Sequence, residues 1–457
     1  MIPATRVRRA PTSVLALLFL TCVACDGGTS ALFGKRYSIA DQIADATNAN
    51  TPFTPTPQPT SAERVLVSET ATLSLTPMFT VGDGRSGHPL QFVGGVTQVL
   101  PLRNGRIVVN DQRDRKLHVL DSAGRLLSSQ PASGVPPDLL TRVFGTPSFF
   151  ADMVSRGDTL VALSRNYNRG AGHTVNLLVA GKPELTRALT DLDDNRTSVE
   201  PRLRGVSAML DAFVSENHWM SGARKLSQPQ QTLWRVAPSD TADLTTRVLQ
   251  YTRADSLLTV NEGKDAFRAL FGSRVSIAFS DRLIYLARDT SPRIEVFSLD
   301  GTARRTIDLN AARVPITPEI FARKRDAIFR MYGSMDTALK TALAEHSYPA
   351  HQPIIRELVA APDGHLLVLR EDLGWDAPKD EQRLVFDVFD ASFRHIGRGR
   401  VARDEWIKLF NPPLLCTTHF QPDAPESSRG KLENGETPPT RGLVTCYRIG
   451  ESGAATP

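Results

Sequence analysis

The sequence predicts an all-β fold, a six-bladed β-propeller with a short helical insertion between blades four and five. Two observations predict it. A unit of turn, strand, strand and turn recurs along the chain, and the second strand of a unit is apolar at nearly every position. A strand has this character when both faces of its sheet are covered, as in a blade that lies between two others. A β-sandwich, the competing architecture, would not require five or six similar units.

Each unit begins with a turn that contains Asp or Gly and leads into an apolar strand. The clearest copies start at Asn104-Gly105, Asp281-Arg282 and Asp363-Gly364. Looser copies start near Gly157 and Phe213, and a last copy follows Pro413-Leu414. We therefore expect second strands to begin near positions 105, 158, 213, 282, 364 and 413.

The helical insertion is expected at about residues 316–346. Thr317-Pro318-Glu319 provides a capping residue followed by proline at the first helical position, which is typical of a helix start. Leu339 and Leu343, four residues apart, indicate a second short helix.

Both ends of the chain are expected to contribute to one blade. Thr72–Leu75 and Met78–Val81 precede the first complete unit, and Trp406–Phe410 opens the last one. Propellers complete a blade in this way so that no sheet edge stays open.

The first 24 residues have the pattern of a secretion signal. Arg6, Arg8 and Arg9 precede a short apolar run, Val14–Leu20. The segment ends in Cys22-Val23-Ala24-Cys25, which resembles the lipobox of bacterial lipoproteins, although that family usually has leucine where this chain has Cys22. The resemblance implies that Cys25 is acylated and becomes the mature N-terminus, anchored to a membrane. An ordinary signal-peptidase cut and an uncleaved anchor are the alternatives.

The predicted organisation after the signal is a tether, one domain and a tail. Residues 25–63 form a Thr/Pro-rich tether, because prolines this dense prevent helices and paired strands. Residues 64–450 form the propeller and 451–457 a disordered tail. The expected location is the cell envelope, on the periplasmic or extracellular side. The formal net charge of +5 includes three arginines of the signal, so the mature domain has no basic excess that would indicate nucleic acid.

Cys416 and Cys446 remain as a pair after the signal is removed and Cys25 is lipidated. In an oxidising compartment such a pair predicts a disulfide, and two buried free thiols are the alternative.

Several segments resemble the NHL-like six-bladed β-propellers of exported bacterial lipoproteins. They are residues 348–355 (Tyr-Pro-Ala-His-Gln-Pro-Ile-Ile), the following 361–368, the helical segment before them and the opening at 76–82. The resemblance covers roughly residues 70–402. It implies six blades and an extracytoplasmic location, and it implies no reaction.

The sequence contains no phosphate loop, HExxH or GxSxG motif. The central channel of the propeller is therefore the expected site, lined by the innermost strand of each blade. We place these strands at residues 96–100, 149–154, 207–213, 275–279, 354–359 and 405–409. Their polar residues, the candidate ligand contacts, are Gln98, Asp152, Asp211, Arg356 and Glu357. Either Asp152, Asp211 and Arg356 pair with one another or face channel water, or they form a ring that recognises a ligand.

We expect a membrane-tethered, non-catalytic binding or scaffold module that contacts a small molecule, a glycan or a protein through one face. The alternative is a propeller enzyme, a lyase or hydrolase that uses polar channel residues. We expect no cofactor, no metal and no nucleic-acid partner.

Overall fold

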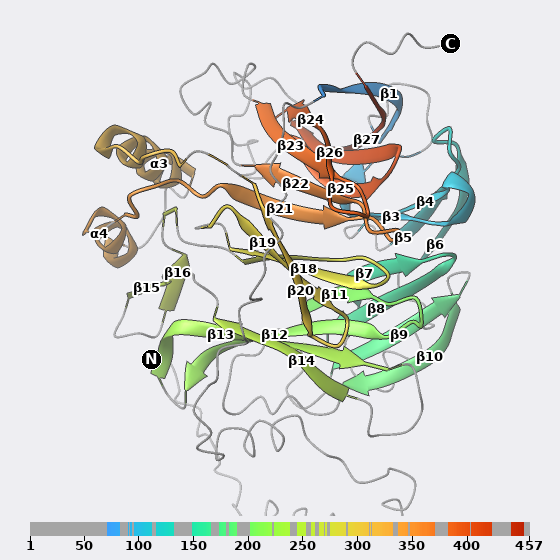
Figure 1. Ribbon diagram of the computed structural model, residues 1–457, viewed down its shortest axis with the longest axis horizontal. Coiled ribbons are helices and arrows are strands. Elements are labelled where there is room, and N and C mark those ends of the chain that lie inside the picture. Colours follow the sequence, from blue (N-terminus) through green and yellow to red (C-terminus); the bar gives the residue numbers. More distant parts are fainter. Residues whose placement is uncertain are drawn as a thin grey trace, which may run out of the picture. The chain divides into compact units, whose positions relative to one another are not determined.

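The fold is an all-β propeller with few helices, here as a computed structural model (Figure 1). The structure describes residues 71–451 except 83–89, 91, 94–95, 112–115, 132–148, 166–172, 180–181, 190–201, 222–223, 238–244, 253–256, 261–264, 269, 272–274, 289–290, 310, 312, 332–336, 346–347, 371–382, 403 and 423–439. The predicted signal, Cys25, the tether and the tail after 451 lie outside the described residues.

Five antiparallel sheets each contain four strands that follow one another in the chain. Sheet 1 contains β3 (Val96–Pro101), β4 (Ile107–Asp111), β5 (Lys116–Leu120) and β6 (Leu126–Pro131). Sheet 2 contains β7 (Phe149–Arg156), β8 (Thr159–Arg165), β9 (His173–Val179) and β10 (Lys182–Leu189). Sheet 3 contains β11 (Arg202–Val206), β12 (Ala212–Ser221), β13 (Arg224–Val236) and β14 (Thr245–Thr252). Sheet 4 contains β17 (Val275–Phe279), β18 (Leu283–Arg288), β19 (Arg293–Ser298) and β20 (Ala303–Asp308), and sheet 5 contains β21 (Ile355–Ala360), β22 (Leu366–Arg370), β23 (Arg383–Phe389) and β24 (His395–Ala402).

A further sheet, the closing sheet, joins the two ends of the described chain. It contains β25 (Trp406–Asn411), β26 (Leu414–Pro422), β27 (Thr440–Glu451), β1 (Leu73–Val81) and the two-residue β2 (Phe92–Val93). Figure 1 shows blue β1 beside red β27, and the pair is in register from Leu73 opposite Glu451 to Val81 opposite Val444. The prediction that residues 72–81 complete the last sheet is confirmed.

The first strands of the sheets form a closed ring. β3 contacts β7, β7 contacts β11, and the series continues through β17, β21 and β25 back to β3. Side chains link neighbours around this ring. Gln98 exchanges two hydrogen bonds of 3.0 Å with the backbone of Met153, and the Ser276 hydroxyl accepts one of 2.8 Å from the Leu358 amide.

Apolar side chains fill the space between each pair of consecutive sheets. Tyr285 and Ile294 of sheet 4 pack with Phe389 of sheet 5, and corresponding clusters lie between all other consecutive pairs. One cluster, around Val99 and Leu409, joins sheet 1 to the closing sheet. Burying a side chain of this size contributes roughly 1.5–3 kcal/mol, so the interfaces between sheets are the core of the fold.

The observed strands refine the sequence prediction in two places. The regular four-strand pattern occurs in five sheets rather than six, because the last sheet gains β1 and β2 from the other end of the chain. The placement of an innermost strand at residues 207–213 was wrong. The first strand of sheet 3 is β11, Arg202–Val206, and residues 207–211 form the turn into β12, where Leu210 has a φ of 65°.

Two helices, α3 (Pro318–Met331) and α4 (Thr337–Glu345), separate β20 from β21 in the chain. The Thr317 hydroxyl accepts a 3.3 Å hydrogen bond from the Ile320 amide, which is the capping contact that the sequence suggests. Phe321 and Leu343 pack with Leu270 and Phe271, close to the short hairpin of β15 (Leu257–Val260) and β16 (Asp265–Arg268).

Cys416 and Cys446 are opposite each other on β26 and β27 and form a disulfide, with α-carbons 4.1 Å apart. The bond closes a loop that spans 30 residues. Restricting an unfolded loop of this length stabilises the fold by about 3 kcal/mol in the chain-entropy model.

We predict that the double variant Cys416→Ser/Cys446→Ser lowers the free energy of unfolding by about 3 kcal/mol. Urea unfolding of both proteins without reductant measures the difference. Alkylation of two thiols in the unreduced, denatured wild-type protein would show that the bond does not form.

Tyr285 links sheet 4 to sheet 5. Its buried hydroxyl donates a 2.9 Å hydrogen bond to the Gly364 carbonyl, and burial raises its pKa from 10.0 to about 12. The folded pKa lies above the unfolded one, so the protonated phenol stabilises the fold fully below about pH 10, and this contribution is lost as pH rises towards 12.

We predict that Tyr285→Phe lowers the free energy of unfolding at pH 7 by about 1 kcal/mol, because the Gly364 carbonyl loses its donor. The variant should also lose less stability than the wild type between pH 10 and 12. Denaturant unfolding across this range tests both, and parallel losses in the two proteins would contradict the assignment.

Candidate functional site

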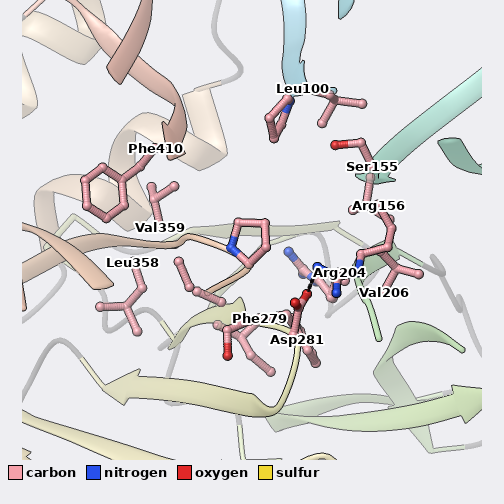
Figure 2. Close-up of a pocket in the computed structure, with 18 of the residues that line it drawn as sticks. Leu100, Ser155, Arg156, Arg204, Val206, Phe279, Asp281, Leu358, Val359 and Phe410 are labelled. Atoms are coloured by element: carbon pink, nitrogen blue, oxygen red, sulfur yellow. Dashed lines mark ion pairs between the residues drawn. The ribbon is translucent and has the colours of Figure 1, made fainter. Parts of the chain in front are cut away.

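A cavity lies at the centre of the ring of first strands. Its volume is about 230 Å³, and residues of all six first strands, mostly from their second halves, line it together with residues of the turns that follow (Figure 2). We call it the axial cavity. First strands run parallel to one another around a propeller, so these strand ends meet at the same end of the channel.

Much of the wall is apolar. Figure 2 shows Leu100, Val206, Phe279, Leu358 and Phe410 around the cavity. Glycine at 205 shapes this wall, because a Cβ there would lie 2.3 Å from the Phe279 ring. Phe279 can therefore lie against β11 and stack on Phe213 with ring centroids 5.0 Å apart.

The charged groups of the axial cavity are three basic side chains and one carboxylate. The basic ones are Arg156 of β7, Arg204 of β11 and Lys408 of β25, all half-buried, and the carboxylate is Asp281, in the turn after β17. Arg156 and Asp281 form an ion pair, drawn as a dashed line in Figure 2. Their strands are separated in the ring by β11, so the pair spans part of the cavity mouth.

β-bulges place two of these cations. The pairing register shifts by one residue in five of the first strands, and the extra residues are Thr97, Ala151, Arg204, Arg356 and Lys408. A bulge leaves one residue unpaired in the ladder and re-aims its side chain. Arg204 and Lys408 thus reach the cavity from strand positions whose side chains would face elsewhere if side chains alternated strictly along the strand. The Arg204 Nε donates a 2.8 Å hydrogen bond to the Ser215 hydroxyl, which holds part of the guanidinium in place.

The predicted contacts Gln98 and Asp152 lie on first strands but bind neighbouring strands. Gln98 binds the Met153 backbone. Asp152 accepts hydrogen bonds from Arg202 Nη1 at 3.4 Å and from the Leu203 amide at 3.3 Å. These contacts join consecutive sheets, and neither residue lines the axial cavity.

Asp211 lies in the turn between β11 and β12. It is buried and pairs with Arg235 of β13, with Oδ2 2.7 Å from Nη2, and it also accepts a hydrogen bond from the Ser207 hydroxyl at 3.1 Å. The structure thus pairs Asp152 with Arg202 and Asp211 with Arg235, where the sequence suggested pairing among Asp152, Asp211 and Arg356.

Arg356 and Glu357 are half-buried on β21. The Arg356 guanidinium lies 5.5 Å from the ring centroid of Trp406, which is half exposed at the start of β25. Lys408 Nζ lies at the same distance from that ring. A role of the five predicted residues in ligand binding stays a prediction.

Sequence reasoning missed all four charged residues of the axial cavity. Arg156 and Asp281 lie just beyond the predicted innermost segments, and Arg204 precedes the misplaced third one. The positions of Arg156 and Asp281 could have indicated their role, because both residues lie next to turns, at the strand ends that meet around the channel.

Among the described residues, no group of three or more His, Cys, Asp or Glu side chains could hold a metal ion. No helix in the described part of the chain is long and apolar enough to cross a membrane.

No protein-family model matches the sequence, and no curated protein matches it. Solved structures with a similar fold include a DUF4221-family member from Bacteroides vulgatus (8% identity, TM-score 0.44), which covers 84% of this chain and 100% of its own. They also include the calcium-binding protein regucalcin from Agrobacterium tumefaciens (13% identity, TM-score 0.33), which covers 84% of this chain and 97% of its own. We take no functional residue from these proteins.

Proposed function

We propose that the protein is a non-catalytic, membrane-tethered binding module whose axial cavity takes a small anionic group such as a carboxylate or a phosphate. The observation that carries the proposal is the charge of this cavity, where Arg156, Arg204 and Lys408 stand against the single carboxylate of Asp281. Guanidinium and ammonium groups are the side chains that proteins use to bind such anions.

Burial makes this charge effective. At the effective dielectric near a protein surface, two unit charges 4 Å apart interact by about 4 kcal/mol, against about 1 kcal/mol in bulk water. The three cations are already held around the cavity on different first strands. Little conformational entropy is therefore lost in bringing them together when an anion binds. The volume, about 230 Å³, equals roughly eight times the share of one water in the liquid. The cavity therefore suits a single anionic group.

The same side chains favour binding over catalysis. General acid–base chemistry needs a group that can exchange a proton near neutral pH, such as His or a carboxylate in a suitable environment. The only carboxylate among the residues that line the axial cavity is Asp281, and it is held in an ion pair with Arg156.

We also propose that the domain has six blades and that a lipid tethers it to a membrane. The closing sheet counts as a sixth blade, because its first strand completes the ring of first strands. On this count α3 and α4 form an insertion between blades four and five. A lipid on Cys25 and the Pro-rich segment after it would hold the domain at a membrane in the cell envelope.

We predict that the purified domain binds inorganic phosphate in the axial cavity. Arg204→Gln and Lys408→Met should each weaken binding by about tenfold, which corresponds to about 1.4 kcal/mol. Asp281→Asn should tighten it, because the ligand no longer competes with this carboxylate for Arg156. Isothermal titration calorimetry at low salt measures the affinities.

The matched control is Arg293→Gln, which removes an exposed cation that pairs with Asp308 on the last two strands of sheet 4. It should leave phosphate binding unchanged. Equal weakening by Arg293→Gln would show that only net charge matters, and unchanged binding in the Arg204 and Lys408 variants would exclude the axial cavity.

We predict that Cys25→Ala moves the full-length protein from the membrane fraction to the aqueous phase, because the acylated residue is lost. Detergent partitioning of wild type and variant after expression in a bacterial host measures the change. Recovery of the wild type in the aqueous phase would refute the anchor.

A further inference from the structure

A second, larger cavity adjoins the axial one. Its volume is about 810 Å³, and four turn regions of sheets 4 and 5 line it. We call it the turn groove; its residues are Ser280–Leu283, Ser298, Arg304, Arg305, Pro362–Gly364, Ala391 and Phe393. In an antiparallel sheet the turns after the first and third strands lie at the same end, so these turns surround the end of the channel where the axial cavity lies.

The two cavities adjoin each other. Ser280, Asp281 and Pro362 line both of them. The Asp281 amide donates a 3.0 Å hydrogen bond to the Pro362 carbonyl, which ties the turns of sheets 4 and 5 together at this junction. The Asp281–Arg156 ion pair stands at the same point (Figure 2). An anionic group that passes from the turn groove to Arg156 would replace the Asp281 carboxylate there.

Arginines dominate the polar lining of the turn groove. Arg282, Arg304 and Arg305 line it with two carboxylates, Asp281 and Asp363. Asp281 pairs with Arg156, and Asp363 lies 3.0 Å from His365 Nδ1. The hydroxyls of Ser280 and Ser298 form hydrogen bonds within their own turns, so the arginines are the main donors that face the groove.

Phe393 occupies a backbone position that this chain elsewhere gives to glycine. The turns Asp121–Arg125 and Asp390–Arg394 have the same hydrogen bonds: in each, the aspartate carboxylate accepts from two backbone amides and pairs with the arginine. The fourth residue has a φ of 81° in the first turn, where it is Gly124, and 65° in the second, where it is Phe393. A bulky residue is an outlier in this region, and such outliers gather at binding sites.

The Phe393 ring has two roles in the structure. Part of it packs on the core between sheets 4 and 5, with Tyr285 edge-on at 6.5 Å between centroids. It also lines the turn groove, where the Arg305 guanidinium lies 4.9 Å from its centroid. The guanidinium thus brings hydrogen-bond donors next to the aromatic ring on the wall of the groove.

We propose that the axial cavity and the turn groove form one extended site for an acidic oligosaccharide. The anionic group of one sugar enters the axial cavity, and the following sugar rings lie along the turn groove over Phe393 and Arg305. This inference rests on the proposed function of the axial cavity. Sugars bind arginine and aspartate side chains through their hydroxyl groups, and their C–H groups pack against aromatic rings.

A peptide fits the turn groove less well. Extended peptides add along an exposed strand edge, whereas most residues that line this groove lie in or next to turns, and the edge strand β20 contributes only its start, at Arg304 and Arg305. Peptide hot spots are apolar or aromatic side chains in desolvated pockets, whereas the apolar lining here is limited to Leu283, Pro362, Ala391 and Phe393.

The test is binding of galacturonate oligomers of one to four units, with inorganic phosphate as a second probe, by calorimetry on the purified domain. We expect the affinity of the wild type to rise at least ~10-fold from the monomer to the trimer. Arg305→Gln and Arg304→Gln should each remove most of this gain and leave monomer and phosphate affinities within about twofold. Phe393→Gly, which restores the residue of the equivalent turn, should act in the same way.

Arg125→Gln is the control, because Arg125 is an exposed arginine at the equivalent turn of sheet 1, where it corresponds to Arg394, and it lines neither cavity. It should keep the full gain with length. Equal affinity for all oligomer lengths, with phosphate still bound, would refute sugar binding in the turn groove but not anion binding in the axial cavity. Binding of the trimer that depends on Arg305, without any binding of phosphate or monomer, would refute the axial site alone. The same rise in affinity with length for oligoglutamates of matched charge would contradict the proposal that the ligand is a saccharide.

Discussion

Each of the five four-stranded sheets and the closing sheet has two apolar faces, and the closure of the ring is what covers all of them. β1 and β27 come from opposite ends of the described chain and pair antiparallel in the closing sheet. Without this pairing, the cluster around Val99 and Leu409 and the cluster around Phe386 and Leu415 would lose part of their cover. The Cys416–Cys446 disulfide lies in the same sheet and joins its two central strands. The pairing of the two chain ends and the disulfide therefore both stabilise the sheet that closes the ring.

Closure also creates the site. Once the ring is closed, all six first strands end around one channel, and residues near those ends face a common space. Bulges in β11 and β25 turn Arg204 and Lys408 towards it, while Gly205 lets Phe279 approach β11 and form the wall. The cations are positioned by backbone geometry before any ligand arrives, so little conformational entropy is lost when an anion binds. The turns of sheets 4 and 5 then extend the same space outward.

The strands could be predicted from the sequence far better than the site. Second strands were expected near 105, 158, 213, 282, 364 and 413, and they begin at Ile107, Thr159, Ala212, Leu283, Leu366 and Leu414, because apolar runs after Asp or Gly turns are strong local signals. The third innermost strand was misplaced, since residues 207–211 form a turn without glycine in which Leu210 takes a positive φ. Bulges leave no mark in the hydrophobic pattern, so the roles of Arg204 and Lys408 were hidden. The Arg156–Asp281 pair depends on two strands that are not neighbours, which no local pattern reveals.

The most direct test of the central claim, that the closed ring holds an anion site on its axis, is an anomalous difference map from a crystal soaked in selenate. The tetrahedral dianion matches the chemistry proposed for the axial cavity, and selenium marks its position without ambiguity. We predict a peak between Arg156, Arg204 and Lys408, with the Asp281 carboxylate displaced from Arg156. Peaks confined to surface arginines, with the axial cavity empty and the Arg156–Asp281 pair intact, would contradict the account.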